Sequence, residues 1–257
     1  MTETTAEADH SDGRMTLMEH IAEFRDRMVK SALAIFVGAI IGWFAFDWIL
    51  EFAKGPYCDI QPSEDECKFL QTQVLEQFSI RLTVAGYTGL ALAMPVILWQ
   101  LWRFITPGLY PHEKRYAVPF VLSGVILFIL GAALAFWTVP RALSFLVNIG
   151  GGDQFESFFT ASNYLSFLVK MMIGFGIGFE FPILLVFLQL AGLVKPQQLG
   201  SWRRYAIVAI VILVAVITPS GDPFSLMVLS VPMYLFYEIS IIAGRILTRR
   251  RTAAQAG

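Results

Sequence analysis

Two glutamates have the residue type and the position to bind guanidinium groups. Glu23 lies on the polar face of an amphipathic segment, and Glu113 is the only acid in the stretch 106–115. The spans counted below place both residues on one side of a membrane. Two carboxylates on one surface can each take a guanidinium through a pair of parallel hydrogen bonds. The alternatives are a surface ion pair of Glu23 with Arg27, four residues on, and a solvated loop acid at Glu113.

A third glutamate, Glu180, falls near the middle of a long apolar stretch. Glycines precede it and Pro182 follows it. An ionised carboxylate at the centre of a bilayer costs about 3 kcal/mol or more. It must therefore face a cavity, a partner or a proton, unless its role is purely structural. Lys170 lies about 15 Å away along a helix, too far to pair with it, and is expected to snorkel toward the outer interface.

Other polar or helix-breaking residues fall near the ends of apolar stretches. Asp222 directly precedes Pro223, a position typical of a helix N-cap. Glu238 is expected to pair with Arg245 or to meet the lipid headgroups. Pro56 breaks the backbone of an outer loop, and spacing alone assigns it no role.

Catalytic and cofactor signatures are absent from the sequence. It contains no H-E-x-x-H, G-x-S-x-G, Walker A or G-x-G-x-x-G motif. Its three histidines and two cysteines are too scattered to form a metal cluster, and a net charge of −1 excludes binding of nucleic acid by bulk charge. We therefore expect no catalytic residue, no metal, no cofactor and no nucleic acid. Any work must draw its energy from a partner or from the membrane potential.

The elements that position these residues are predicted to be membrane spans. The set AVILMFWYC makes up 56% of the 257 residues, and Asp, Glu, Lys and Arg make up 15%. Soluble domains have about 45–50% apolar residues, with glycine included, and about 25% charged residues. A soluble domain of this size cannot bury so much apolar surface. The composition therefore predicts an all-α integral membrane protein in contact with a lipid bilayer.

Six apolar stretches are candidates for transmembrane helices. The expected spans are 31–50, 82–102, 116–140, 164–190, 205–217 and 223–244. We expect the last two to be short, because the apolar part of the fifth rises only about 20 Å. The tight turn 218–222 would pack these two spans as an antiparallel hairpin.

A short amphipathic helix at the membrane surface is expected to lead into the first span. Thr16 and Glu19 fit a capping box at its start. The helical repeat defines its apolar stripe: Leu17, Ile21, Phe24 and Met28. The chain is thus divided into a disordered cytoplasmic tail (1–15), a membrane domain (16–247) and a basic cytoplasmic tail (248–257).

The basic residues predict the orientation of the spans. Fourteen of the 19 lysines and arginines fall on the side that holds both termini and four on the other, with Lys170 inside a span. The side richer in Lys and Arg is cytoplasmic. Both termini are therefore expected in the cytoplasm, as an even number of spans also requires.

Cys58 and Cys67 both fall in the first outer loop, 51–79. That loop would face an oxidising compartment. We expect the two cysteines to form a disulfide that closes a small loop; the alternative is two free thiols.

Several motifs in this order resemble the TatC family, the core subunit of the twin-arginine protein translocase. The segment 18–27 (MEHIAEFRDR) resembles the family's N-terminal H-[LI]-x-E-[LF]-R-x-R motif, and 102–115 (WRFITPGLYPHEKR) is similar to its first cytoplasmic loop. The segment 178–182 (GFEFP) resembles its F-E-x-P signature. The segments 217–224 (ITPSGDPF) and 231–238 (VPMYLFYE) resemble its last hairpin.

The resemblance implies a receptor for the signal peptides of folded precursor proteins, which carry paired arginines. It implies a multi-pass protein of a prokaryotic cytoplasmic membrane, in an oligomeric complex with single-span subunits of the TatA/TatB type. By position, the signal-peptide surface would comprise Glu23, Glu113, Arg25, Phe104 and Pro107. Residues matching family positions linked to partners or translocation are Pro56, Glu180 and Asp222.

Two departures from the family pattern weaken the match where partners would dock. Phe136 replaces a tyrosine found in some members, and Leu226 replaces a glutamine found in many.

The rival class is a secondary transporter that uses Glu180 as a proton-coupling acid. The lack of internal repeats and of further buried polar residues argues against it. A membrane enzyme is a weaker option, because no nucleophile–base pair is visible.

Overall fold

A computed structural model of the chain describes residues 17–58, 69, 73–105, 117–149, 160–190, 192–218 and 221–255. All regular elements in these ranges are helices. They are α1 (Leu17–Phe44), α2 (Phe46–Cys58), α3 (Glu76–Ile105), α4 (Ala117–Ile149), α5 (Ala161–Phe179), α6 (Phe181–Leu190), α7 (Pro196–Ser201), α8 (Arg203–Ile217) and α9 (Pro223–Gln255).

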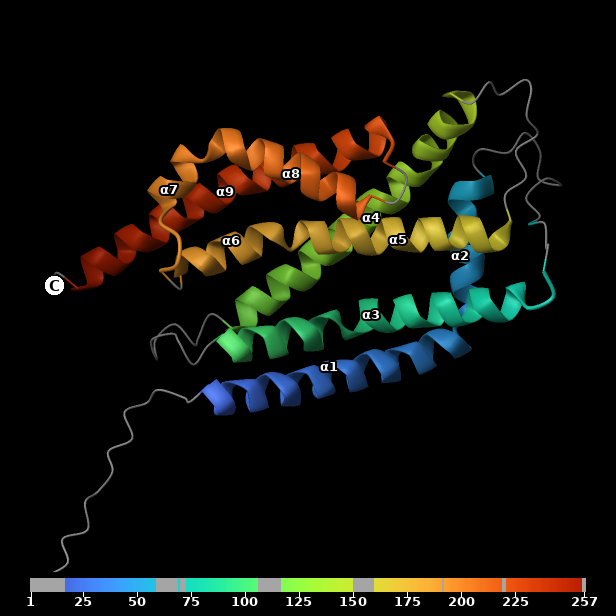
Figure 1. Ribbon diagram of the computed structural model, residues 1–257, viewed down its shortest axis with the longest axis horizontal. Coiled ribbons are helices and arrows are strands. Elements are labelled where there is room, and N and C mark those ends of the chain that lie inside the picture. Colours follow the sequence, from blue (N-terminus) through green and yellow to red (C-terminus); the bar gives the residue numbers. More distant parts are fainter. Residues whose placement is uncertain are drawn as a thin grey trace, which may run out of the picture.

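The first span differs from the expected one. The expected surface helix is not a separate element in the described residues, because α1 runs without a break from Leu17 to Phe44. The chain then bends at Ala45, and α2 turns away from the axis of α1 (Figure 1). The expected span 31–50 is therefore wrong at its end, and the first part of the expected outer loop is helical. Hydropathy merges the two helices because no proline or glycine marks the bend.

Helices α1 and α3 lie side by side along most of their length (Figure 1). Glycine makes this approach possible at Gly89, where an added Cβ would come within 2.6 Å of the backbone nitrogen of Ala39. Small residues at such crossings let two backbones approach closely in a bilayer, where van der Waals packing drives helix association. The two helices therefore form one closely packed pair.

The core lies between α4, α5 and α9. Its fully buried side chains include Met171, Phe175, Leu229, Met233 and Ile241. Thr160 caps the start of α5 by accepting a hydrogen bond from the N–H of Asn163 at 3.3 Å. Helices α5 and α6 run nearly in line and are interrupted at Glu180, next to Pro182. Proline lacks the N–H that would continue the helix, which explains the interruption.

Five helical stretches of the described residues are long and apolar enough to cross a membrane: 18–44, 76–104, 118–146, 161–190 and 223–246. Helix α8 has 15 residues, so its expected shortness is confirmed. The expected shortness of the last span is wrong, since α9 has 33 residues. Its helix continues beyond the apolar stretch into 249–251, because arginine is a good helix former.

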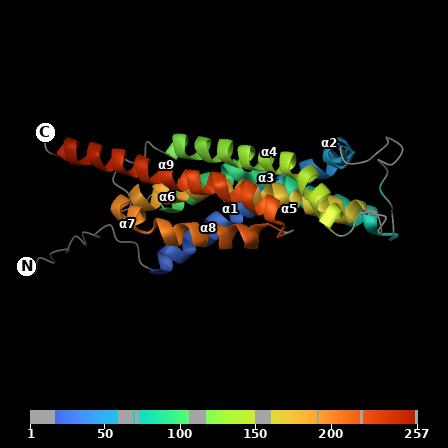
Figure 2. The same cartoon turned by 90° about the horizontal axis from the view of Figure 1, so that it is seen from above.

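The start of α1 and the end of α9 lie at the same end of the bundle (Figures 1 and 2). This end, here named the basic end, also holds the end of α3 and the start of α8. Its basic side chains include Arg25, Arg27, Arg103, Arg203, Arg204 and Arg245. The opposite end, named the far end, holds α2 and the starts of α3 and α5. The helices thus segregate the basic residues as the sequence predicts.

Candidate functional site

The first candidate site lies at the basic end, where α1 meets the end of α3. The ring of Phe104 stacks on His20, with centroids 4.6 Å apart, and contacts Phe24 at 5.5 Å. His20, Glu23, Phe24 and Arg27 follow a spacing of i, i+3, i+4 and i+7, so they share one face of α1. Glu23 therefore lies on the face of α1 that Phe104 contacts through His20 and Phe24.

The carboxylate of Glu23 is only partly satisfied. Its Oε1 forms an ion pair with Arg27, which is the alternative that the sequence left open. The side chains of Arg27 and Glu23 are only 14% and 20% exposed. Oε2 of Glu23 is buried and accepts no hydrogen bond from any described residue. Oε2 is therefore available to a further donor. A hydrogen bond to it would remove the cost of burying an acceptor without a partner.

Apart from Phe24, the face of α1 that meets α3 is not the apolar stripe. Ile21 and Met28 are 62% and 55% exposed, whereas Glu23 and Arg27 are half-buried. A bilayer accounts for this arrangement, since apolar side chains there can face lipid while polar ones face protein. Arg25 is exposed and lies off the face that meets α3. Thr16, Pro107, Glu113 and Cys67 lie outside the described residues.

The second candidate site surrounds Glu180 at the junction of α5 and α6. Both of its carboxylate oxygens are buried without a hydrogen-bond partner among the described residues. The side chain lines a cavity of about 270 Å³. The other lining residues are apolar and come from α3, α4, α5, α6 and α8, among them Leu98, Phe120, Leu184, Leu213 and Ile217. The acid therefore faces an apolar cavity, which is one of the alternatives that its cost in a membrane left open.

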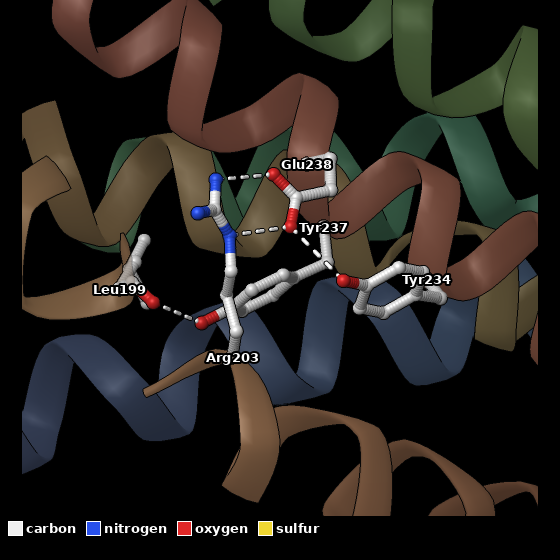
Figure 3. A network of polar contacts seen from close by, with 5 residues as sticks. All are labelled: Leu199, Arg203, Tyr234, Tyr237 and Glu238. Carbon is white, nitrogen blue, oxygen red and sulfur yellow. Dashed lines mark hydrogen bonds and ion pairs between the residues drawn. The ribbon is translucent and has the colours of Figure 1, made fainter. Parts of the chain in front are cut away.

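A polar cluster fastens the α7–α8 segment to α9 (Figure 3). The Arg203 guanidinium donates from Nε and Nη2 to the two carboxylate oxygens of Glu238, at 2.7 and 2.8 Å. Tyr234 donates to Glu238 at 3.1 Å, and the buried Tyr237 hydroxyl donates to the carbonyl of Leu199 at 2.6 Å. The expected pairing of Glu238 with Arg245 is wrong. The hairpin brings Arg203, 35 residues away in sequence, into bidentate geometry with this acid.

Asp222 and Pro56 each belong to a helix: Asp222 caps the start of α9, and Pro56 lies inside α2. Oδ1 of Asp222 accepts a hydrogen bond from the N–H of Ser225 at 2.7 Å, which is the N-cap expected at the start of α9. Pro56 is buried inside α2 rather than in a loop. Cys58 ends α2 and is disulfide-bonded. Since Cys67 lies outside the described residues, their pairing stays a prediction.

Two further residues, Gly124 and Glu76, were not assigned a role from the sequence. Gly124 lies against the carboxylate of Glu180. Glu76 is buried and accepts from the N–H groups of Gln73 at 3.3 Å and Ser162 at 3.4 Å, so it links the starts of α3 and α5. An acid in the first turn is typical of a helix start, but the link to Ser162 is a tertiary contact. In the described part of the chain, no group of three His, Cys, Asp or Glu residues could hold a metal ion.

Comparisons with known proteins agree with this arrangement. The family model described as Sec-independent protein translocase protein (TatC) matches residues 19–232. The chain is 37% identical to the TatC of Aquifex aeolicus, over 94% of this chain and 99% of that one. It is also 37% identical to the TatC of Frankia casuarinae, over 93% of this chain and 68% of that one.

Solved structures resemble the fold equally well. A crystal structure titled twin arginine translocase receptor TatC superposes with a TM-score of 0.74 at 36% identity, and covers 90% of this chain and 100% of that one. A second, in the detergent DDM, gives a TM-score of 0.75 at 38% identity, with 88% and 99% covered. The fold and these matches define a helical membrane subunit of a protein translocase. The chain belongs to the TatC family of the twin-arginine translocase. The transporter alternative finds no support in these matches.

Proposed function

We propose that the chain is the signal-peptide receptor of its translocase and that Glu23 binds a signal arginine at the basic end. The observation that carries this proposal is the buried, unpaired Oε2 of Glu23 beside Phe104. A guanidinium offers the donors that this oxygen lacks, and the aromatic rings limit access of water. Charge-assisted hydrogen bonds of this kind contribute about 1.5–3 kcal/mol each.

The pair of Glu23 with Arg27 supports the same proposal. Arg27 holds the carboxylate in one orientation before the signal peptide binds. This reduces the conformational entropy that the side chain loses on binding. A planar guanidinium can then bond to the free oxygen while Arg27 keeps the other. Lysine lacks the planar fork, so a twin-lysine peptide should bind less well than its charge suggests. Glu113 would bind the second arginine, with Arg25 and Pro107 bordering the surface.

Site-specific crosslinking tests this assignment. A photoreactive residue in place of Phe104 should capture a twin-arginine precursor and should capture much less of its twin-lysine variant. A probe in place of Trp137, exposed in the part of α4 nearer the far end, serves as the matched control. Equal capture of both precursors at position 104 would contradict the assignment.

Glu180 is proposed as the contact for a polar group from the span of a partner subunit. Its two unpaired oxygens lie in an apolar cavity, where a donor from another helix would remove the cost of burial. Single-span subunits of the TatA/TatB type are the partners that the family membership suggests, in an oligomeric complex. Replacement by leucine should abolish crosslinks to such a subunit; intact crosslinks and intact export would leave Glu180 a structural residue.

The topology is proposed as six spans in the cytoplasmic membrane of a prokaryote, with both termini in the cytoplasm. Helix α8 would be the fifth and shortest span, with its exposed apolar face toward lipid or a partner. The clamp between Arg203 and Glu238 supports this, since it holds α8 antiparallel to α9 at the basic end. Accessibility of single cysteines placed at Arg25 and Val74 to an impermeant reagent in cells should differ, with position 74 labelled from outside.

A further inference from the structure

A pocket of about 820 Å³ opens at the far end, where α1 gives way to α2 and α3 begins. It is distinct from both sites described above. Its wall carries two cationic and two acidic side chains set among aromatic rings: Lys54, Arg81, Asp47 and Glu76, with Trp43, Phe46 and Phe78. Such a balance of charge is typical of a site for a ligand that itself carries both signs.

Arg81 is fixed in this pocket. Its Nε and Nη2 donate to the carbonyl of Trp43 at 3.2 and 3.1 Å, at the bend where α1 ends. Its guanidinium carbon lies 5.1 Å from the ring centroid of Trp43 and 5.2 Å from that of Phe46. A guanidinium has five N–H donors, so these two bonds leave further donors for a ligand. The contacts hold the cation in place without neutralising its charge.

Lys54 and Asp47 are the charged side chains of the pocket that have no polar partner among the described residues. Both belong to α2, and neither forms a hydrogen bond or ion pair with another described residue. Glu76 is different, because its two oxygens accept from Gln73 and Ser162. Lys54 therefore adds a cation to the pocket that Arg81 lines, and Asp47 adds a carboxylate to the same pocket.

The level of the pocket across the membrane indicates which ligand fills it. The apolar run of α1 ends at Phe44, and that of α3 begins at Glu76, so the pocket lies where both spans leave the apolar layer. In a bilayer this level is occupied by headgroups, and Trp, Lys and Arg are enriched there. Phospholipid headgroups are thus present at high local concentration beside the opening.

We propose that this pocket binds the phosphoethanolamine headgroup of a phospholipid. The phosphate lies on Arg81 and Lys54, and the ammonium donates to Asp47. Two positive and two negative side chains favour this zwitterion over an anionic headgroup, which has no cation to meet Asp47. A choline headgroup has no N–H to donate to the carboxylate.

Lipid retention on the purified full-length chain tests the proposal. The chain is exchanged into detergent with equal amounts of phosphatidylethanolamine, phosphatidylglycerol and phosphatidylcholine, and bound lipid is counted by native mass spectrometry. We expect phosphatidylethanolamine to be retained about tenfold over each of the others, the effect of one charge-assisted contact. Lys54→Gln should lower this retention by a similar factor, and Asp47→Asn should remove the preference over phosphatidylglycerol.

The matched control is Arg141→Gln. Arg141 is an exposed arginine in the last part of α4, packed on Trp137 at 3.7 Å and absent from the pocket wall. It should retain lipid like the unaltered chain. An equal loss with Lys54→Gln and Arg141→Gln, or a preference for phosphatidylglycerol, would overturn the proposal. Complete displacement of the lipid by soluble glycerophosphoethanolamine would also overturn it, by showing a site for a free zwitterion instead of a lipid.

Discussion

The carboxylate of Glu180 in the α5–α6 junction lies directly against Gly124 of α4. A Cβ added at Gly124 would come within 3.0 Å of Oε2 of Glu180 and within 2.6 Å of Leu98. The acid therefore keeps its place only because the facing residue has no side chain. The absence of a side chain on α4 is as much a part of this site as the glutamate itself.

Gly124→Ala should displace the carboxylate of Glu180 and impair partner contact while the chain still folds. The added methyl group would be tighter than ordinary packing allows, so Glu180 or Leu98 must move. Crosslinking from position 180 to a partner span should fall severalfold. Gly86→Ala is the control, because an added Cβ there has nothing within 4 Å. Equal crosslinking in the two variants would refute a positioning role for Gly124.

Asp222→Ala should destabilise the protein by about 0.5–2 kcal/mol, the usual cost of losing an N-cap. The bond from Ser225 N–H to Oδ1 is lost, and the first turn of α9 is left without this partner. Asp222→Asn keeps the cap and removes the charge, so its thermal midpoint in detergent should stay close to that of the unaltered chain. A fall with asparagine as large as with alanine would show that the charge matters instead.

In the polar cluster that fastens α7 and α8 to α9, the buried hydrogen bond of Tyr237 should contribute more to stability than the exposed ion pair of Arg203 with Glu238. Tyr237→Phe removes the hydroxyl that donates to Leu199, at a cost of about 0.5–1.5 kcal/mol. Arg203→Gln breaks an ion pair whose arginine is 48% exposed, and such pairs contribute about 0–1 kcal/mol. Unfolding midpoints in one detergent should therefore drop further for Tyr237→Phe. The reverse order would locate the strength of the clamp in the ion pair.

A disulfide between Cys58 and Cys67 is expected in protein isolated from cells. The position of α2 at the far end puts Cys58 on the side assigned to the oxidising compartment. Peptide mapping without reduction should recover the two cysteines in one linked peptide. Recovery of both in alkylated form would refute the pairing.

Sequence patterns predicted the apolar helices because their signal is local. Runs such as 82–102 and 223–244 need only length and hydropathy to be found. The cap at Asp222 could also be predicted, since an aspartate before a proline is a local start signal. The segregation of basic residues to one end follows in the same way from counting charges between spans.

Contacts between distant segments were not predictable from those patterns. Glu238 has Arg245 seven residues away in sequence, yet its partner is Arg203, which the hairpin brings beside it. The bend at Ala45 carries no proline, and the Arg81 contact at Trp43 spans 38 residues. Gly124 gave no signal at all, since its role depends on which residue faces it. The sequence predicted Glu23 as an acid on a helix face. It could not show that Oε1 pairs with Arg27 while Oε2 has no partner among the described residues.

The most direct test of the account is the affinity of a twin-arginine signal peptide for chains altered at Glu23. Glu23→Gln should weaken binding roughly tenfold or more, as expected from the loss of one charge-assisted bond of about 1.5–3 kcal/mol. Glu19→Gln, one turn earlier on α1, should change it less than about twofold, as expected for an exposed acid. The preference for twin arginine over twin lysine should shrink with Glu23→Gln alone. Unchanged affinity and unchanged preference in that variant would contradict the assignment of Glu23 as the arginine-binding carboxylate.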